Sequence, residues 1–122
     1  MCLLLEVVIK KIQNVLFLCT SNIHRSKTAE HLAPELFPFV EFKSAGLSKK
    51  ECARNDSVLC TKELIFWADM VFVFERMHEK RIYEYLGDVN LNLINLEIED
   101  IYSYYQSELV DLLKVKLIDA IQ

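Results

Sequence analysis

The sequence is short of the residues that break regular structure. Its 122 residues include only 2 glycines and 2 prolines, and they contain no low-complexity run and no internal repeat. This composition excludes a linker, a repeat array or a disordered tail. Since 52% of the residues are hydrophobic and 26% are charged, we expect one ordered domain with its own core over residues 1–122.

Cysteine is also scarce, and its spacing fits neither a disulfide framework nor a zinc site. The four cysteines, Cys2, Cys19, Cys52 and Cys60, are irregularly placed, and no Cys-x-x-Cys or Cys/His pairing gives a zinc pattern. We therefore expect free thiols in a reducing cytoplasm, and neither a metal nor another cofactor.

Long apolar segments and basic clusters are absent as well. The apolar stretch Met1–Ile9 is interrupted by Glu6 and is far shorter than the roughly 20 residues of a transmembrane helix. The formal net charge is −4, and the 14 lysines and arginines are scattered, which argues against nucleic acid or membrane as a partner. Residues 1–10 are either an extra element packed on the domain or a start-site extension. The oligomeric state cannot be read from the sequence.

What the sequence does contain is an alternation of buried-strand and helix patterns. The apolar run Asn14–Cys19 predicts a strand, and apolar residues at helical spacing from Arg25 predict a helix that Pro38 ends. The alternation predicts an α/β domain with a parallel sheet and helices on both faces. Further strands are expected at Phe39–Ser44, with a turn at Ala45 and Gly46, and at Met70–Phe74 and Leu91–Ile98, and further helices at Asp56–Ala68, Arg76–Leu86 and Ser107–Ile121.

The segment between the first strand and the first helix carries a chemical motif. A cysteine, five residues and an arginine can wrap around one centre, with backbone N–H groups and the helix N-terminus binding a phosphate. Arg25 adds a planar fork for two phosphate oxygens, and the same donors stabilise a negative sulfur. A cysteine at the end of a strand is more often simply part of the core, but the motif and its setting outweigh that interpretation. We predict Cys19 as a nucleophile, and phosphate binding by Thr20, Ser21, Asn22, Ile23, His24, Arg25 and Ser26.

The run from Val15 to Glu30 resembles the signature of the low-molecular-weight protein tyrosine phosphatases. Ser44–Gly46 and Trp67–Phe74 are similar to further segments of that family, and the resemblance extends over roughly residues 11–121. It implies a doubly wound domain with a four-stranded parallel sheet in the order 2-1-3-4. It also implies two-step, metal-free hydrolysis of phosphomonoesters, on a phosphorylated protein or a small aryl phosphate.

The resemblance also implies where the general acid lies. The family has a late aspartate followed two positions on by an aromatic residue, and Asp100 with Tyr102 matches that arrangement. Glu99 is the alternative acid, and Tyr102 is a candidate wall of the substrate cleft. The sequence departs from the family pattern at two notable positions. Ile101 replaces the proline that usually follows the aspartate, and His24 replaces a cysteine that is often the second one of the loop.

Several polar and aromatic residues have less specific interpretations. We expect His31 and His78 on exposed helix faces. Tyr104 and Tyr105 either line an aromatic cleft or pack against the last helix. Cys60 reads as a core residue on a helix.

Three other functions are also compatible with the sequence. The phosphate loop could serve a non-catalytic phosphate or phosphoprotein-binding module, a view that Ile101 favours. The same fold also carries phosphatases of the serine-rich RNA polymerase II tail, which have longer chains. Arsenate reductases on this fold use extra thiols, for which Cys52 and Cys60 would be the candidates.

Overall fold

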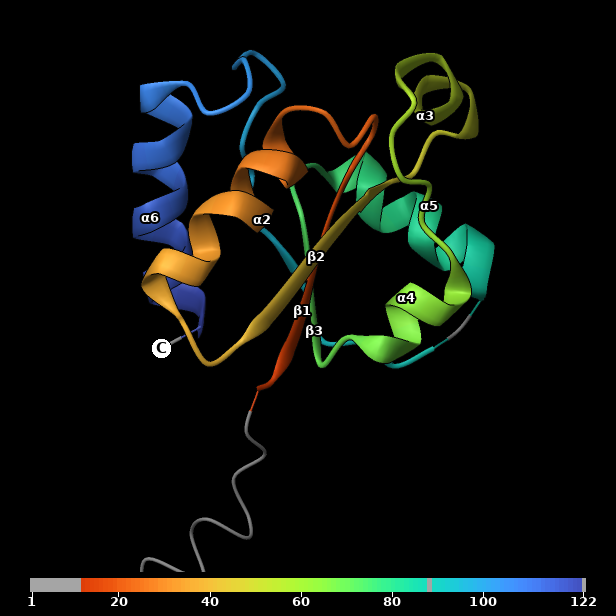
Figure 1. The fold of residues 1–122 in the computed structure, drawn as a ribbon. Helices are drawn as coiled ribbons and strands as arrows, with labels where there is room; N and C mark the ends of the chain where they lie inside the picture. Colours follow the sequence, from red (N-terminus) through yellow and green to blue (C-terminus); the bar gives the residue numbers. More distant parts are fainter. Residues whose placement is uncertain (1–11, 88, 122) are drawn as a thin grey trace, which may run out of the picture.

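The computed structural model of the protein describes residues 12–87 and 89–121, so the expected N-terminal element at residues 1–10 lies outside the described residues (Figure 1). Four strands form one parallel sheet in the order β2-β1-β3-β4, which confirms the predicted topology. The strands are β1 (Asn14–Cys19), β2 (Glu41–Gly46), β3 (Met70–Val73) and β4 (Leu93–Asn95). The helices are α2 (Arg25–Leu36), α3 (Lys49–Asn55), α4 (Lys62–Trp67), α5 (Arg76–Leu86) and α6 (Ser107–Ile121).

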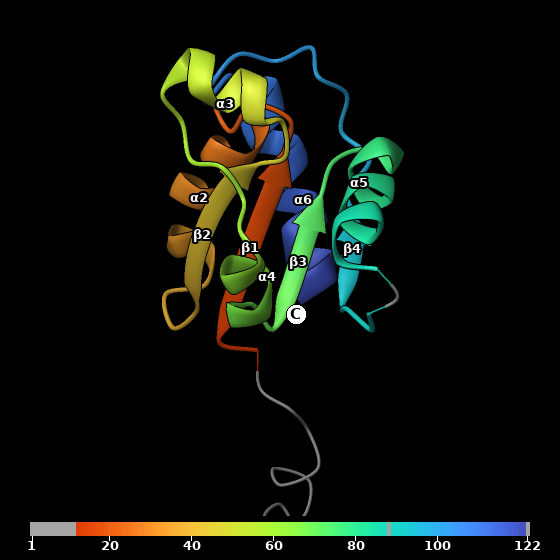
Figure 2. The same cartoon turned by 90° about the vertical axis from the view of Figure 1, so that its right-hand side faces the viewer.

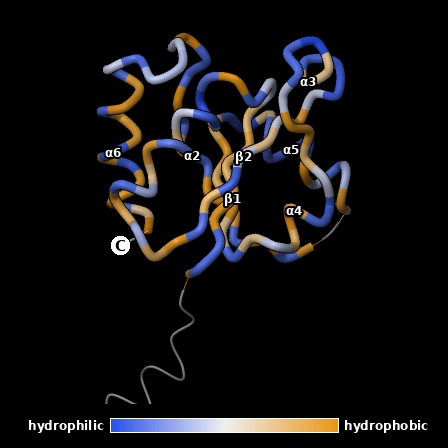
Figure 3. Tube along the Cα trace, in the orientation of Figure 1, coloured by the Kyte–Doolittle hydropathy of each residue, from blue (hydrophilic) through white to orange (hydrophobic). Residues whose placement is uncertain are grey.

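Helices cover both faces of the sheet. Helices α2 and α6 lie against one face and α4 and α5 against the other, while α3 lies near the carboxyl ends of the strands (Figures 1 and 2). The sheet runs as a mainly apolar layer through the middle of the molecule (Figure 3).

Strand β1 divides its side chains between two cores. Val15, Phe17 and Cys19 belong to the core shared with α2 and α6, and Leu16 and Leu18 belong to the core beneath α4 and α5. The alternation follows from the two-residue period of a strand. A strand buried on both faces needs a continuous apolar run, which is the pattern that predicted it.

Gly46 ends a strand and does not form the turn expected at Ala45 and Gly46. Ala45 pairs with Leu18 and Gly46 with Cys19 in the parallel register of β2 and β1. A Cβ on Gly46 would lie 2.4 Å from the Cys52 sulfur, with backbone also in contact range. A glycine is therefore required here for the close approach of neighbouring segments.

The single helix expected over Asp56–Ala68 is wrong. Asp56 ends α3 with a left-handed backbone, φ 52°, and Thr61 caps α4 through its side chain. Between the two helices, Leu59 forms a parallel bridge with Gly46. Pairing with the sheet edge overrides the local apolar periodicity, and Cys60 accordingly precedes α4 instead of lying on a helix.

The remaining boundaries differ only at the ends. The predicted helices Arg76–Leu86 and Ser107–Ile121 match α5 and α6. The second strand starts at Glu41, two residues after Phe39, which is 95% exposed. Strand β4 is shorter than the predicted Leu91–Ile98. Within the described ranges, no helix is both long and apolar enough to cross a membrane.

Candidate active site

The phosphate loop, residues 19–26, lies at the carboxyl edge of the sheet. It starts at the last residue of β1 and ends in the first turn of α2. Because β2 and β3 flank β1 on opposite sides, strand order reverses at this point. In open α/β sheets such a switch point is where ligands bind.

The Cys19 sulfur has a hydroxyl partner inside the loop. Its Sγ lies 2.9 Å from the Oγ of Ser26, and Cys19 is 3% exposed. The Ser26 oxygen already accepts a hydrogen bond from the Asn22 amide, at 2.8 Å, so its own O–H is available to donate to the sulfur. A donated hydrogen bond stabilises negative charge on sulfur.

Asn22 anchors the phosphate loop to neighbouring segments of the chain. It is fully buried and has a left-handed backbone, φ 57°, which asparagine tolerates better than most residues. Its amide also donates to Ser44 of β2 at 2.9 Å, and its side-chain oxygen accepts from the Val58 backbone N–H at 3.3 Å. One side chain thus ties the loop to two other segments.

Arg25 is buried, and both terminal nitrogens of its guanidinium have partners. Its NH1 group donates to the Ile98 carbonyl and its NH2 group pairs with the Glu75 carboxylate, both at 2.8 Å. Among the described residues, its Nε–H has no hydrogen-bond partner although it is buried. Buried donors are nearly always paired, so this N–H remains available to an acceptor that the protein itself does not supply.

The structure brings Asp100 to the phosphate loop although their positions in the sequence differ by 74 or more. One Asp100 carboxylate oxygen lies 3.6 Å from Arg25 NH2, and the side chain is 57% exposed. A small pocket is lined by Asp100 together with Cys19, Thr20, Ser21, Ile23, His24 and Arg25. Most of the predicted phosphate-binding residues therefore share one pocket, whereas Asn22 and Ser26 lie behind it.

The other two residues proposed for this region lie elsewhere. Glu99 lines a neighbouring pocket that it shares with Asp100, not the pocket around Cys19. Tyr102 packs, half-buried, against the core beneath α2 and α6. Neither side chain lines the pocket that contains the sulfur.

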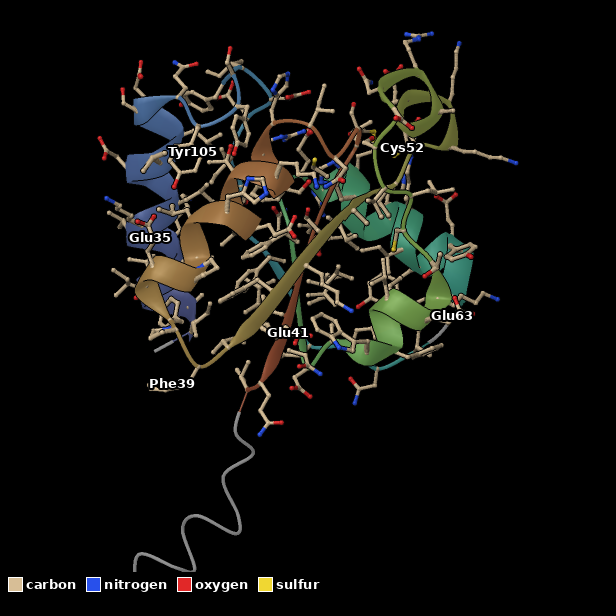
Figure 4. The ribbon with its side chains drawn as sticks, viewed as in Figure 1. Glu35, Phe39, Glu41, Cys52, Glu63 and Tyr105 are labelled. Atoms are coloured by element: carbon tan, nitrogen blue, oxygen red, sulfur yellow. The ribbon has the colours of Figure 1, made fainter. Side chains whose placement is uncertain are left out.

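Two tyrosines attach the acid loop, residues 97–106, to α2. Tyr105 donates its backbone N–H to the Thr28 hydroxyl at 2.9 Å and its phenol to Glu35 at 3.2 Å, as Figure 4 shows for the latter pair. The Tyr104 hydroxyl lies 2.6 Å from His31, which is exposed as expected. Both tyrosines thus form hydrogen bonds with residues of α2.

His78 and Glu75, which the sequence analysis did not identify, contact the phosphate loop from α5 and from the residue before it. His78 was expected on an exposed helix face, but it is fully buried, and its Nε2 lies 3.1 Å from the Thr20 hydroxyl. Burial, and next the positive charge of Arg25, lower the pKa of His78 from 6.5 to about 4. The available signal was topological, because both residues follow a strand whose carboxyl end is adjacent to that of β1.

The remaining described cysteines are buried free thiols. The Cys52 sulfur lies behind the loop, 3.8 Å from the Ser21 carbonyl oxygen (Figure 4). Burial, with a smaller contribution from Cys52, raises the pKa of Cys60 to about 12. In the described part of the chain, no three His, Cys, Asp or Glu side chains are grouped to hold a metal ion.

The sequence matches no protein-family model and no curated protein sequence. Solved structures do match. The low-molecular-weight protein tyrosine phosphatase SP-PTP from Streptococcus pyogenes is 15% identical with a TM-score of 0.72, over 90% of this chain and 91% of that one. The tyrosine phosphatase Wzb from Escherichia coli K30, in complex with phosphate, is 22% identical with a TM-score of 0.68, over 90% and 96%.

The YwlE arginine phosphatase from Geobacillus stearothermophilus is also similar, with 24% identity and a TM-score of 0.66 over 90% of this chain and 93% of that one. These matches span nearly all of both chains. The chain has the fold of the low-molecular-weight tyrosine phosphatases, and the resemblance seen in its sequence is confirmed at the level of the fold.

Proposed function

We propose that the protein is a cysteine-dependent phosphomonoester hydrolase that acts on phosphotyrosyl groups. The observation that carries this proposal is the meeting of three side chains at one pocket: Cys19, Arg25 and Asp100. Cys19 is buried, Arg25 has an unpaired Nε–H among the described residues, and the Asp100 carboxyl lies 3.6 Å from Arg25. They would supply a nucleophile, an anion clamp and an acid, which are the parts that thiolate-based phosphate-ester cleavage requires.

In the first step, the Cys19 thiolate attacks the phosphorus of the substrate. The S–P bond forms as the P–O bond to the leaving group breaks, and protonated Asp100 gives its proton to the leaving oxygen. Arg25 and the loop hold the phosphoryl oxygens while negative charge shifts between them. The product is a cysteinyl phosphate.

In the second step, the Asp100 carboxylate takes a proton from a water molecule that attacks the phosphorus. The S–P bond breaks, and the Cys19 thiolate and inorganic phosphate are released. The hydrogen bond available from Ser26 stabilises the sulfur as a leaving group, because its negative charge is met by a fixed donor.

The burial of the nucleophile favours a long substrate side chain. Cys19 is 3% exposed, so a phosphoryl group must enter the pocket to reach the sulfur. A phosphotyrosyl side chain carries its phosphate several bonds further from the backbone than a phosphoseryl one, which argues against the phosphoserine alternative. SP-PTP and Wzb are both described as tyrosine phosphatases.

Phosphoarginine is the second candidate substrate. Its guanidinium would meet the carboxylates of Glu75 and Asp100, which lie within 4 Å of Arg25, and YwlE is described as an arginine phosphatase. Arsenate reduction is disfavoured, because a thiol relay needs accessible thiolates. The pKa of Cys60 is raised to about 12, and Cys52 is 3% exposed.

The test is turnover of p-nitrophenyl phosphate by the wild type and by Cys19→Ser between pH 5 and 7. We expect the variant to lose at least about 10³-fold in kcat/KM. Wild-type-like turnover by the variant would remove Cys19 from the mechanism. Binding of orthovanadate by a wild type without turnover would favour the non-catalytic binding module.

A second assay identifies the substrate. Peptides of one sequence, phosphorylated on tyrosine, serine or arginine, are compared by their kcat/KM for phosphate release. The phosphotyrosyl peptide should react fastest, and a preference for the phosphoarginyl peptide would replace it with the second candidate.

We also infer a reducing compartment, the cytoplasm, because Cys19, Cys52 and Cys60 are free thiols.

A further inference from the structure

The segment that follows β3 contains a buried imidazole whose hydrogen bonds lead into the phosphate loop. His78 is fully buried in the first half of α5, and both of its ring nitrogens have partners. Nδ1 faces the Phe74 backbone N–H at 3.2 Å, and Nε2 faces the Thr20 hydroxyl at 3.1 Å. Thr20 is the residue after the proposed nucleophile and lines its pocket.

The first of these contacts fixes the tautomer of the imidazole. A backbone N–H can only donate, so Nδ1 of His78 must accept and carries no proton. The ring proton of the neutral imidazole is then on Nε2. Burial and the charge of Arg25 lower the pKa of His78 to about 4, so this neutral tautomer is the form present at neutral pH.

The second contact sets the direction of the Thr20 hydroxyl. Nε2–H donates to the Thr20 oxygen, which leaves the Thr20 O–H to donate to another acceptor. The Glu75 carboxylate also lies near Nε2, at 3.7 Å, but it is closer to Arg25, at 2.8 Å. The shorter contact to Thr20 is therefore the hydrogen bond of the imidazole.

We propose that His78 is a positioning residue that orients the Thr20 hydroxyl as a hydrogen-bond donor to the phosphoryl group. The proposal rests on the proposed function, because it needs an anion in the pocket. Three hydrogen bonds then point the same way, from Phe74 N–H to His78, from His78 to Thr20, and from Thr20 to a phosphoryl oxygen. Such a donor, held in place before the substrate arrives, stabilises a bound oxyanion without reorganisation.

Two substitutions separate the two hydrogen bonds of His78. The side-chain oxygen of His78→Asn can take the place of Nδ1 and accept from Phe74, but its amide does not reach Thr20. The amide of His78→Gln extends to the position of Nε2 and can donate to Thr20, but it leaves Phe74 without its acceptor. Lys80→Gln, at an exposed position of the same helix, is the matched control.

The measurement is the dissociation constant of orthovanadate, with the thermal midpoint of unfolding recorded for each variant. We expect His78→Asn to weaken orthovanadate binding about 10-fold with little change in the midpoint. His78→Gln should bind within about 3-fold of wild type while its midpoint falls. A merely structural role would instead make binding follow the midpoint.

Thr20 provides a second test that does not depend on how well the His78 variants fold. Thr20→Val should weaken binding about as much as His78→Asn, and Thr20→Ser, which keeps the hydroxyl, should restore it. The double variant Thr20→Val/His78→Asn should bind no worse than Thr20→Val alone.

Additive losses in the double variant, or wild-type binding by His78→Asn, would overturn the positioning role. Failure of the wild type to bind orthovanadate would overturn both this role and the proposed function. If the wild type binds orthovanadate but hydrolyses no phosphoester, the hydrolase proposal fails, while the binding comparison still decides the role of His78.

Discussion

The phosphate loop and the acid loop are built in opposite ways. In the phosphate loop, Cys19, Asn22, Arg25 and Ser26 are at most 3% exposed. Side chains of this loop are held by residues from β2, from the position before α5 and from the segment before α4. In the acid loop, the Asp100 side chain is 57% exposed. Its neighbour Ile101 is 67% exposed.

Because of this difference, we expect phosphate binding to depend on the phosphate loop and the chemical step to depend also on the acid loop. A loop that is fixed by buried hydrogen bonds is organised before a substrate arrives. We therefore expect its proposed phosphate binding to be independent of Asp100. Among the described residues, the ion-pair contact of Asp100 is with Arg25, at 3.6 Å, so its proposed role depends on how the acid loop is held. Substitutions in the two loops should therefore have separable effects.

The largest effect is expected for Arg25→Lys. The guanidinium reaches Ile98, Glu75 and a further acceptor from three separate nitrogens. The single nitrogen of an ammonium cannot occupy these three positions. We expect kcat/KM for p-nitrophenyl phosphate to fall about 10³-fold, and orthovanadate binding to weaken with it. A loss of less than 10-fold in both would show that the loop binds anions without the guanidinium fork.

Asp100→Asn should affect turnover but not binding. The amide cannot supply a proton, so we expect kcat to fall about 10²-fold for an alkyl phosphate, whose leaving oxygen needs that proton most. Orthovanadate affinity should remain within about 3-fold of wild type. Glu99→Gln is the matched comparison, and if it loses activity in place of Asp100→Asn, the general acid is Glu99.

A pH effect on stability is expected from His78. Its pKa is lowered from 6.5 to about 4 by burial and by the charges of Arg25 and Arg81, against which Glu75 and Asp100 act in the raising direction. Between these two pH values the unfolded chain binds a proton that the folded chain does not. The free energy of unfolding is therefore highest above pH 6.5 and falls as the pH approaches 4, by on the order of 3 kcal/mol.

Urea unfolding at pH 7, 5.5 and 4.5 measures this dependence. Carboxylates also contribute to acid destabilisation, so the comparison is with His78→Asn, which has no titrating group at this position. The wild type should lose more stability than the variant over that interval. Equal losses would show that the imidazole accepts a proton in the folded protein as easily as in water.

The sequence predicted the elements whose signal is local. The apolar run of β1, the motif after it and the periodic pattern of α5 each lie within about ten residues, and their boundaries agree with the structure. The helix expected over Asp56–Ala68 failed because a distant partner decides that segment. Leu59 pairs with Gly46, and a bridge to another strand leaves no trace in local periodicity.

The same distinction applies to the site. Asp100 was found through the resemblance, and no local pattern places it beside Arg25. His78 was missed because a histidine on a charged helix normally faces water, and only the adjacency of β3 to β1 turns it toward Thr20. Residues that position other residues carry no motif of their own, so they become visible only when the topology is known.

The smallest effect is expected where the two loops are joined. The Thr28 hydroxyl donates to the His24 carbonyl of the phosphate loop at 2.7 Å and accepts the Tyr105 backbone N–H of the acid loop at 2.9 Å. Thr28→Val keeps the shape of the side chain and removes both bonds. We expect kcat to fall about 3-fold, because Asp100 is held less well, while orthovanadate affinity stays near wild type.

Tyr105→Phe is the control for this prediction, since it removes only the exposed hydrogen bond to Glu35 and should leave kcat unchanged. If Thr28→Val instead weakens orthovanadate binding and leaves kcat intact, then Thr28 supports the phosphate loop through His24 and not the acid loop. In that case the acid loop would be held independently of the Thr28 hydroxyl. Substitutions in the two loops would then have even more distinct effects than we propose.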